Sequence, residues 1–315
     1  MTEGGHSRRD PVPALDPVVP LLGPIAITGE SGQVGQALRR RLAVVPDVRA
    51  IGRQDDLVEP CRDASAVVHL AGTLRPDRRN GHEEANLDTV RRTLSALARS
   101  SVERVVFLSC VGADPSSGNA YLRAKGQAEQ LLHQSGLDLV VLRCTHIFGP
   151  PEDPGPTVSA LQAGGSDSIW ILGDGRQRVA PVYREDVVDA IVAALDPRTF
   201  HGRFDLPGPD EMTMDEFVRT VNRDGIPVRH LPRRAARLFA HVAPGLNPDL
   251  VDVMSSDNLG EQHRADQAFM LRRHSLAEIY RPRAEVTHAL NARQADPRPM
   301  RSGRAPHGSR DQASA

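Results

Sequence analysis

Two side chains in the middle of the chain could exchange a proton with a ligand. Tyr121 and Lys125 stand four positions apart in a stretch that predicts a helix, so the phenol and the ammonium face the same side, one turn apart. A nearby positive charge favours the ionised form of a phenol. Lys125 could therefore assist Tyr121 in passing a proton to or from a substrate oxygen. Lys125 is the only lysine in the chain, against 38 arginines, which favours this interpretation over a chance pair on an exposed helix face.

A glycine-rich turn near the start of the chain could hold a diphosphate. Gly29, Gly32 and Gly35 are spaced three apart between an apolar run and an amphipathic stretch. In a strand-turn-helix unit the first glycine permits the tight turn, the second lets the backbone approach a pyrophosphate, and the third lets the helix pack against the strand. An ordinary turn without a ligand is the alternative, but the context favours a dinucleotide held by helix-start amides. The residues expected to contact it here are Thr28, Gly29, Ser31, Gly32, Gln33, Val34 and Gly35.

The second strand is expected to end near Arg53, with no acidic residue at that position. A carboxylate there would hold a ribose 2′-hydroxyl, whereas a guanidinium matches a 2′-phosphate in charge and geometry. We therefore predict NADP as the preferred cofactor, with NAD as the alternative. The competing interpretation is a surface arginine in an arginine-rich protein.

The elements around these residues alternate between short β-branched runs and longer amphipathic stretches. The expected strands are residues 24–28, 48–53, 66–70, 104–109 and 137–143, and the expected helices are residues 33–43, 83–99, 120–134, 186–195 and 213–222. Such alternation predicts an α/β fold with a doubly wound parallel Rossmann sheet and a smaller C-terminal substrate lobe.

The chain divides into four expected parts. Residues 24–150 are expected to form the NAD(P)-binding Rossmann domain, and residues 151–281, richer in proline and glycine, a substrate lobe partly interleaved with the sheet. Residues 1–23 and 282–315 have little apolar periodicity, which indicates a disordered leader and a disordered tail.

Composition narrows the classes of partner. The 39 Lys and Arg residues balance 40 Asp and Glu, so we expect a small-molecule substrate and neither a nucleic acid nor a membrane as partner. The leader has no apolar run typical of a signal peptide, and Cys61, Cys110 and Cys144 are widely spaced, which together indicate free thiols and a cytoplasmic location. The dispersed histidines indicate no metal site. Nothing in the sequence indicates the oligomeric state.

These motifs resemble the short-chain dehydrogenase/reductase family, especially its extended and atypical members, the NAD(P)-dependent epimerases and dehydratases. The likeness covers roughly residues 24–222, and its signatures are Thr28-Gly29-x-x-Gly32-x-x-Gly35 and Tyr121-x-x-x-Lys125. The resemblance implies that Lys125 also holds the nicotinamide ribose. It further implies cofactor contacts from Asp56, Leu57, Leu70, Ala71, Gly72 and Asn86.

The resemblance also implies a hydroxyl donor that polarises the substrate carbonyl at the end of the strand over residues 104–109. Two candidates compete, because the family's usual two-serine pattern aligns Ser109 with the first serine and Cys110 with the catalytic one. A thiol is the weaker hydrogen-bond donor. Cys110 could instead be a small buried residue at a strand end.

Two functions follow from the resemblance. The first is an NAD(P)-dependent oxidoreductase, or an epimerase or dehydratase, that transfers a hydride with Tyr121 as acid/base and Lys125 as ribose and phenolate partner. The alternative is a non-catalytic NADP-binding sensor, regulator or assembly factor. The run of residues 107–115 is similar to atypical branches that include nitrogen-metabolite regulators and a complex I accessory subunit.

Overall fold

The computed structural model describes residues 23–53, 55–75, 81–155, 157–158, 168–243 and 246–280. The expected tail and all but the last residue of the expected leader lie outside these ranges. The described residues up to Tyr280 form one compact unit.

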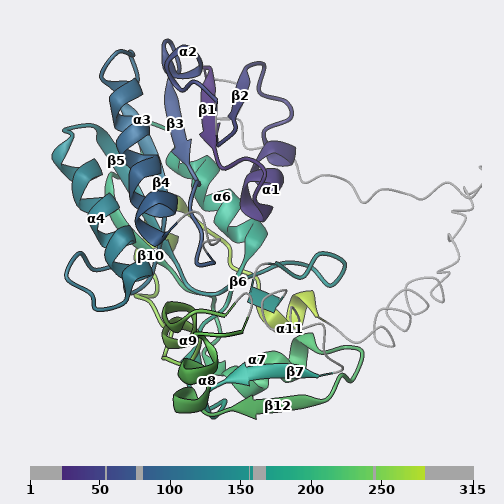
Figure 1. Cartoon of the computed structure of the whole chain (residues 1–315). Coiled ribbons are helices and arrows are strands. Elements are labelled where there is room, and N and C mark those ends of the chain that lie inside the picture. Colours follow the sequence, from purple (N-terminus) through teal and green to yellow (C-terminus); the bar gives the residue numbers. More distant parts are fainter. Residues whose placement is uncertain are drawn as a thin grey trace, which may run out of the picture. The chain divides into compact units, whose positions relative to one another are not determined.

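Six parallel strands form the central sheet, in the order β10-β5-β4-β3-β1-β2 (Figure 1). Their bounds are β1 Ile25–Thr28, β2 Val48–Ile51, β3 Ala66–His69, β4 Arg104–Cys110, β5 Asp138–Cys144 and β10 Gly202–Leu206. The sequence expectation of a doubly wound Rossmann sheet is confirmed. Strands covered on both faces read as continuous apolar runs, as β1 and β3 do.

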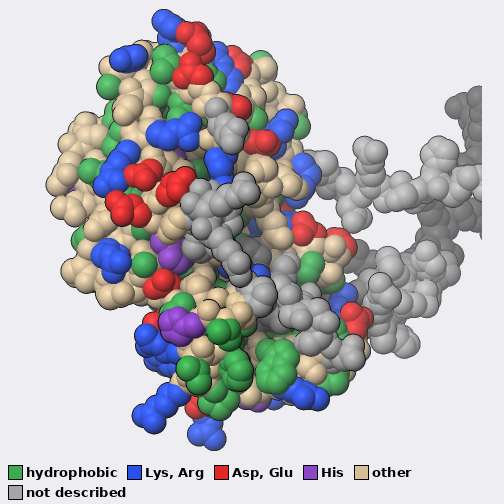
Figure 2. All heavy atoms as spheres, viewed as in Figure 1, with side chains coloured by type: hydrophobic (Ala, Val, Ile, Leu, Met, Phe, Trp, Pro, Cys, Tyr) green, Lys and Arg blue, Asp and Glu red, His purple; other side chains and the backbone are tan. Residues whose placement is uncertain are grey.

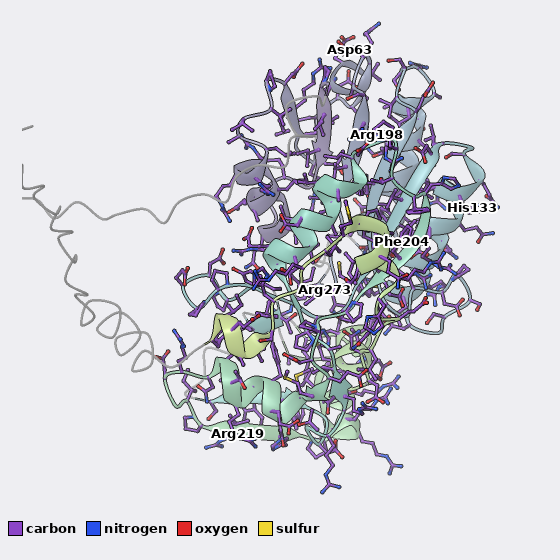
Figure 3. All side chains as sticks on the ribbon, turned by 180° about the vertical axis from the view of Figure 1, so that it is seen from behind. Asp63, His133, Arg198, Phe204, Arg219 and Arg273 are labelled. Carbon is purple, nitrogen blue, oxygen red and sulfur yellow. The ribbon has the colours of Figure 1, made fainter. Side chains whose placement is uncertain are left out.

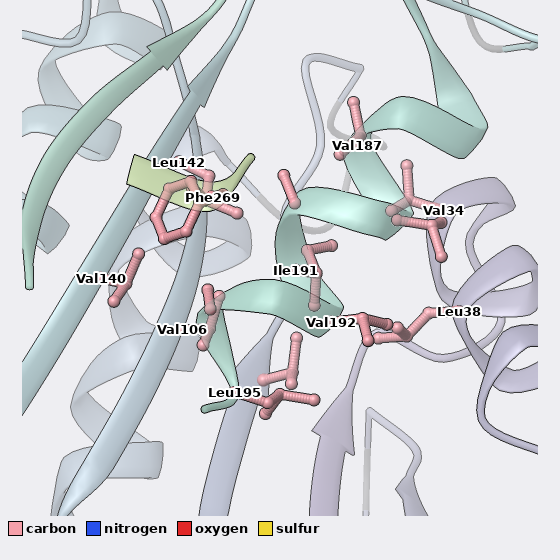
Figure 4. Packing of buried hydrophobic residues seen from close by; sticks show 14 of the residues in the cluster. Val34, Leu38, Val106, Val140, Leu142, Val187, Ile191, Val192, Leu195 and Phe269 are labelled. Carbon is pink, nitrogen blue, oxygen red and sulfur yellow. The ribbon is translucent and has the colours of Figure 1, made fainter. Parts of the chain in front are cut away.

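Helices cover both faces of this sheet. On one face α1 (Gln33–Arg41) and α6 (Arg184–Ala194) pack on the apolar residues of β1, β4 and β5; Figure 4 shows Ile191 of α6 among these side chains. On the other face lie α2 (Val58–Cys61), α3 (Thr89–Leu97) and α4 (Ala120–Gln134). The sheet is thus sandwiched, which leaves its carboxyl edge as the place for a ligand.

A smaller lobe follows the sheet in the sequence. It contains the strand pairs β7/β12, β8/β11 and β6/β9 and a core around Phe148 and Phe217. The elements are β6 Ile147–Phe148, β7 Ile169–Leu172, β8 Arg178–Val179, β9 Val182–Tyr183, β11 Met212–Thr213, α7 Met214–Val221, β12 Val228–Leu231, α8 Arg233–Phe239, α9 Pro248–Met254, α10 Arg264–Phe269 and α11 Leu276–Ile279.

The lobe and the sheet are interleaved in the chain. α6 and β10 come from the expected lobe, yet both belong to the sheet layers. α10 packs on β10 through the rings of Phe204 and Phe269, whose centroids are 4.8 Å apart. Phe204 is labelled in Figure 3, which views the molecule from behind.

The stretch expected as one helix over residues 83–99 contains a local irregularity. A π-helical turn, η2 (Glu84–Asp88), precedes α3. Such turns insert one residue into a helix and are frequent at functional sites. Its buried Asn86 donates hydrogen bonds to the carbonyls of Thr73 and His82, 3.0 and 3.1 Å away, so the turn is tied to the loop after β3.

On the face of the sheet domain in Figure 2, acidic and basic side chains are interspersed, in keeping with the near-zero net charge. Within the described ranges, no helix has the length and apolar character needed to cross a bilayer. No group of three or more potential metal ligands is assembled among the same residues.

Candidate active site

Two cavities meet at the glycine turn. The larger cavity of this pair, of about 380 Å³, is lined by Tyr121 and Lys125. The smaller cavity of the pair, of about 300 Å³, is lined by residues at the end of β2. Four residues line both cavities: Gly29, Gly32, Leu70 and Gly72. The result is an elongated cleft with two ends, the shape that a dinucleotide requires.

Gly29 and Gly32 serve the turn in different ways. Gly29 has φ +76°, and a Cβ there would lie 2.6 to 2.9 Å from backbone atoms of Leu70 and Ala71, so the fold itself requires this glycine. A Cβ on Gly32 would meet nothing closer than the Gly29 carbonyl oxygen at 3.3 Å. The missing side chain of Gly32 therefore leaves room on the cavity side.

The start of α1 is open to an anion. No side chain caps it, and its first turn contains no acidic residue. Gln33, Val34 and Gly35 line the larger cavity, and Ser31 lines the smaller one. Uncapped amides and the positive end of the helix dipole suit a diphosphate at this position.

Arg53 and Leu57 line the smaller cavity at the end of β2. A second guanidinium lines it as well: Arg92 on α3 donates to the carbonyls of Arg53, at 2.8 Å, and Asp55, at 3.4 Å. Sequence reasoning missed Arg92, because nothing in the pattern of α3 distinguishes it from other surface arginines. Asp56 accepts a hydrogen bond from the Val58 amide, 3.0 Å away, and does not line the cavity.

The lining of the smaller cavity combines charged residues, Arg53, Glu84, Asp88 and Arg92, with a neutral polar group around His69. The His69 Nδ1 atom lies 3.0 Å from the Thr28 hydroxyl and 3.1 Å from the Thr93 hydroxyl. Burial lowers the pKa of His69 to about 3, so the imidazole is neutral. Thr28, Ala71 and Gly72 line the same cavity.

Asn86 holds the loop that borders the cleft. Its side-chain oxygen accepts from the Thr73 amide at 3.0 Å, and its side-chain nitrogen donates to the carbonyls of Thr73 and His82. With its amide engaged on both sides, Asn86 positions the backbone after β3, which is its contribution to the cleft.

Tyr121 and Lys125 both line the larger cavity. Asn119 caps α4 by accepting from the Leu122 amide at 3.1 Å, and this fixes Tyr121 in the first turn. The buried Lys125 ammonium donates to the Leu108 carbonyl at 2.6 Å and lies 4.2 Å from the centroid of the Phe107 ring. Burial lowers the pKa of Lys125.

Ser109 and Cys110 have different partners. The Ser109 hydroxyl donates to Glu129 at 2.5 Å, and Glu129 forms a buried ion pair with Arg143 at 2.7 Å. Alternation along β4 places Cys110 on the opposite face from Ser109. There the thiol lies beside Tyr121, and both residues line the larger cavity.

The protonation state of Tyr121 follows from these surroundings. Burial, and then the neighbouring Cys110, raise the pKa of Tyr121 well above its usual value. Burial also raises the pKa of Cys110. The phenol is therefore neutral near pH 7, which is the form that donates a proton.

The larger cavity is also lined by a histidine, His146, that sequence reasoning did not assign to the site. Nε2 of the buried His146, just after β5, has no hydrogen-bond partner among the described residues. The sequence around it gave no sign of this role, since an isolated histidine after a strand is more often structural.

Solved structures of other proteins share this fold. MoeE5 in complex with UDP-glucuronic acid and NAD superposes with a TM-score of 0.64 at 20% identity, covering 85% of this chain and 100% of that one. The UDP-glucuronic acid 4-epimerase of Bacillus cereus, in complex with UDP-glucuronic acid and NAD, gives 0.63 at 17% identity with the same coverage.

Curated relatives are more diverse. An Arabidopsis thaliana protein, the mitochondrial NADH dehydrogenase [ubiquinone] 1 alpha subcomplex subunit 9, is 29% identical over 53% of this chain and 42% of its own length. The Neurospora crassa mitochondrial NADH-ubiquinone oxidoreductase 40 kDa subunit is 23% identical over 75% of this chain and 59% of its own. The ceramide reductase of Caulobacter vibrioides is 25% identical over 54% of this chain and 60% of its own. The matches thus span between about two fifths and three fifths of these relatives.

One family model matches the part of the sequence that forms most of the sheet and the cleft. It is the model of the NAD dependent epimerase/dehydratase family, and the match runs over residues 25–203, from β1 to the start of β10. The glycine turn, the Tyr121 and Lys125 pair and the parallel strands beneath them all fall within that match. The chain belongs to the NAD dependent epimerase/dehydratase family.

Proposed function

We propose that this protein is an NAD(P)-dependent oxidoreductase, or an epimerase or dehydratase that oxidises its substrate transiently, acting on a secondary alcohol or ketone. One observation supports this most directly: Tyr121 and Lys125 line the same cavity as the uncapped start of α1. A nicotinamide dinucleotide bound in this cleft would supply or accept the hydride.

The protein's own residues would handle the proton. In the reductive direction the neutral Tyr121 phenol donates a proton to the substrate oxygen as negative charge develops there. Lys125, fixed by the Leu108 carbonyl, places its ammonium where it can bond ribose hydroxyls and favour the resulting phenolate. In the oxidative direction Tyr121 must first lose its proton, so alcohol oxidation should gain rate as the pH rises toward its raised pKa.

We propose NADP as the preferred cofactor. The support is the pair of arginines, Arg53 and Arg92, that lines the smaller cavity beside the end of β2. Fluorescence titration with NADPH and NADH tests this preference. Tighter binding of NADPH, lost in Arg53→Ala and Arg92→Ala, is expected; equal affinities for the two cofactors would contradict it.

Replacement of the phenol tests the proposed activity. Tyr121→Phe removes the proton donor but keeps the ring, so hydride exchange with carbonyl and sugar-nucleotide substrates should fall by about 10²-fold or more. Cofactor affinity should change little. Tyr183→Phe, in the lobe, is the matched control and should retain wild-type rates. Equal rates for wild type and Tyr121→Phe would refute the assigned role.

The second candidate is a non-catalytic NADP-binding sensor or assembly factor. Two observations favour it: Ser109 is engaged with Glu129, and a thiol rather than a hydroxyl stands beside Tyr121. The similarity to mitochondrial NADH dehydrogenase subunits points the same way. Tight cofactor binding with the same background rate in wild type and Tyr121→Phe would establish this alternative.

A further inference from the structure

One face of α9 lines the larger cavity. Leu250, Val253 and Met254 follow the spacing of a single helix face, and all three line the cavity. The start of α9 is fixed to the start of α4. Asp249 accepts from the Ala120 amide through its side chain at 2.7 Å, and from the Asn119 side chain through its carbonyl at 3.0 Å. The apolar face is therefore held beside the start of α4, the helix that contains Tyr121.

Other walls of this end of the cavity are apolar too. They come from the loop after β4, from α4 and from β6. With the α9 face, six apolar side chains line this end: Val111, Leu122, Ile147, Leu250, Val253 and Met254.

Neighbouring polar groups are mostly used by the protein itself. The Thr145 hydroxyl donates to the Ala180 carbonyl at 2.5 Å, and the Asn258 side-chain oxygen accepts from the His146 amide at 2.8 Å. His146 also lines the cavity, but its unpartnered Nε2 atom is buried, and the whole residue is 7% exposed. Burial lowers the pKa of His146 to about 4, so this imidazole is neutral and adds no charge to the lining.

This lining does not suit a diphosphate. Two adjacent phosphates are usually held by several cations or by backbone amides at a helix start. Among the described residues that line the larger cavity, the cations are Lys125, which bonds the Leu108 carbonyl, and the exposed Arg75. The uncapped helix start, at α1, lies at the cofactor end.

We infer that the substrate carries its reacting carbonyl or alcohol on an apolar body, an alkyl or acyl chain. The inference rests on the proposed oxidoreductase function and names its substrate class. Apolar surface that enters this end of the cavity is removed from water, which raises affinity with each methylene group of the chain.

A ketone series tests the inference. With NADPH, kcat/KM should rise about fourfold for each added methylene from 2-butanone through 2-hexanone and 2-octanone to 2-decanone, until the chain fills the cavity. Val253→Asn puts an amide on the α9 face and should remove most of this gain, so that the kcat/KM values of the variant for 2-decanone and 2-butanone differ much less than those of the wild type. Val228→Asn, at a partly exposed valine of β12 outside the cavity, is the control and should keep the gain. UDP-glucose with NADP or NAD is the polar comparison and should not react.

A binding measurement separates the substrate class from the activity. Calorimetric titration of the same ketones into the complex with NADP, in which no reduction occurs, reports binding alone. If no ketone turns over, but 2-decanone binds more tightly than 2-butanone and Val253→Asn removes the difference, the oxidoreductase proposal fails and the apolar class stands. Turnover that is independent of chain length overturns the inference and leaves the activity. Undetectable or equal binding of the two ketones, or tighter binding of UDP-glucose, also overturns it.

Discussion

Cys110→Ser is the most informative single change at the proposed site, because it replaces a weak hydrogen-bond donor beside Tyr121 with a hydroxyl. The partly exposed Cys110 lines the cavity, so the change leaves no void in the core. A net hydrogen bond contributes about 0.5 to 1.5 kcal/mol. If that bond forms only as charge develops on the substrate oxygen, it corresponds to about a 2- to 12-fold higher kcat.

The assay follows NADPH consumption with a ketone that the wild type reduces. Cofactor affinity should stay the same, because Cys110 lies at the larger cavity beyond the glycine turn. Cys144→Ser is the matched control. Cys144 is the neighbour of Cys110 in the register of β4 and β5, and its thiol is also free, but Cys144 is almost fully buried. If Cys110→Ser is no faster than wild type, or Cys144→Ser gains as much, the thiol does not limit carbonyl polarisation.

The remaining predictions concern stability and the cofactor end. Glu129→Ala should lower the free energy of unfolding by about 1 to 3 kcal/mol, since it leaves the partly buried Arg143 guanidinium without its carboxylate, whereas Glu129→Gln should cost less; urea unfolding of both variants measures this. Because the neutral His69 resists protonation when folded but not when unfolded, it should contribute a fall in stability of about 1.4 kcal/mol per pH unit as the pH drops from 6.5 toward 4, in addition to the fall that His146 contributes. His69→Gln should make the pH slope shallower by about that amount, and an unchanged pH slope would contradict the assignment. Gly32→Ala should weaken NADPH binding and lower the melting temperature much less than Gly29→Ala, which should lower both; equal melting temperatures for these two variants would refute the distinction.

The elements of the fold were readable from the sequence because their signals are short-range. The glycine spacing of the turn, the β-branched runs and the four-residue step from Tyr121 to Lys125 act within one strand or one helix turn. For the same reason α4 was placed with the bounds that the structure has. The π-helical turn at Asn86 was not readable, because it depends on carbonyls of the loop after β3.

Only the tertiary structure decided which side chains, distant from each other in the chain, contact one another. Ser109 engages Glu129, twenty residues away, and so Cys110 is the group beside Tyr121. Arg92 joins Arg53 across 39 residues. Strand alternation and helix periodicity tell which face a residue takes, but the group that meets it there depends on how separate elements pack. The sequence thus determined the family, the glycine turn and the position of Tyr121 and Lys125 one helical turn apart, whereas packing determined the groups that surround them.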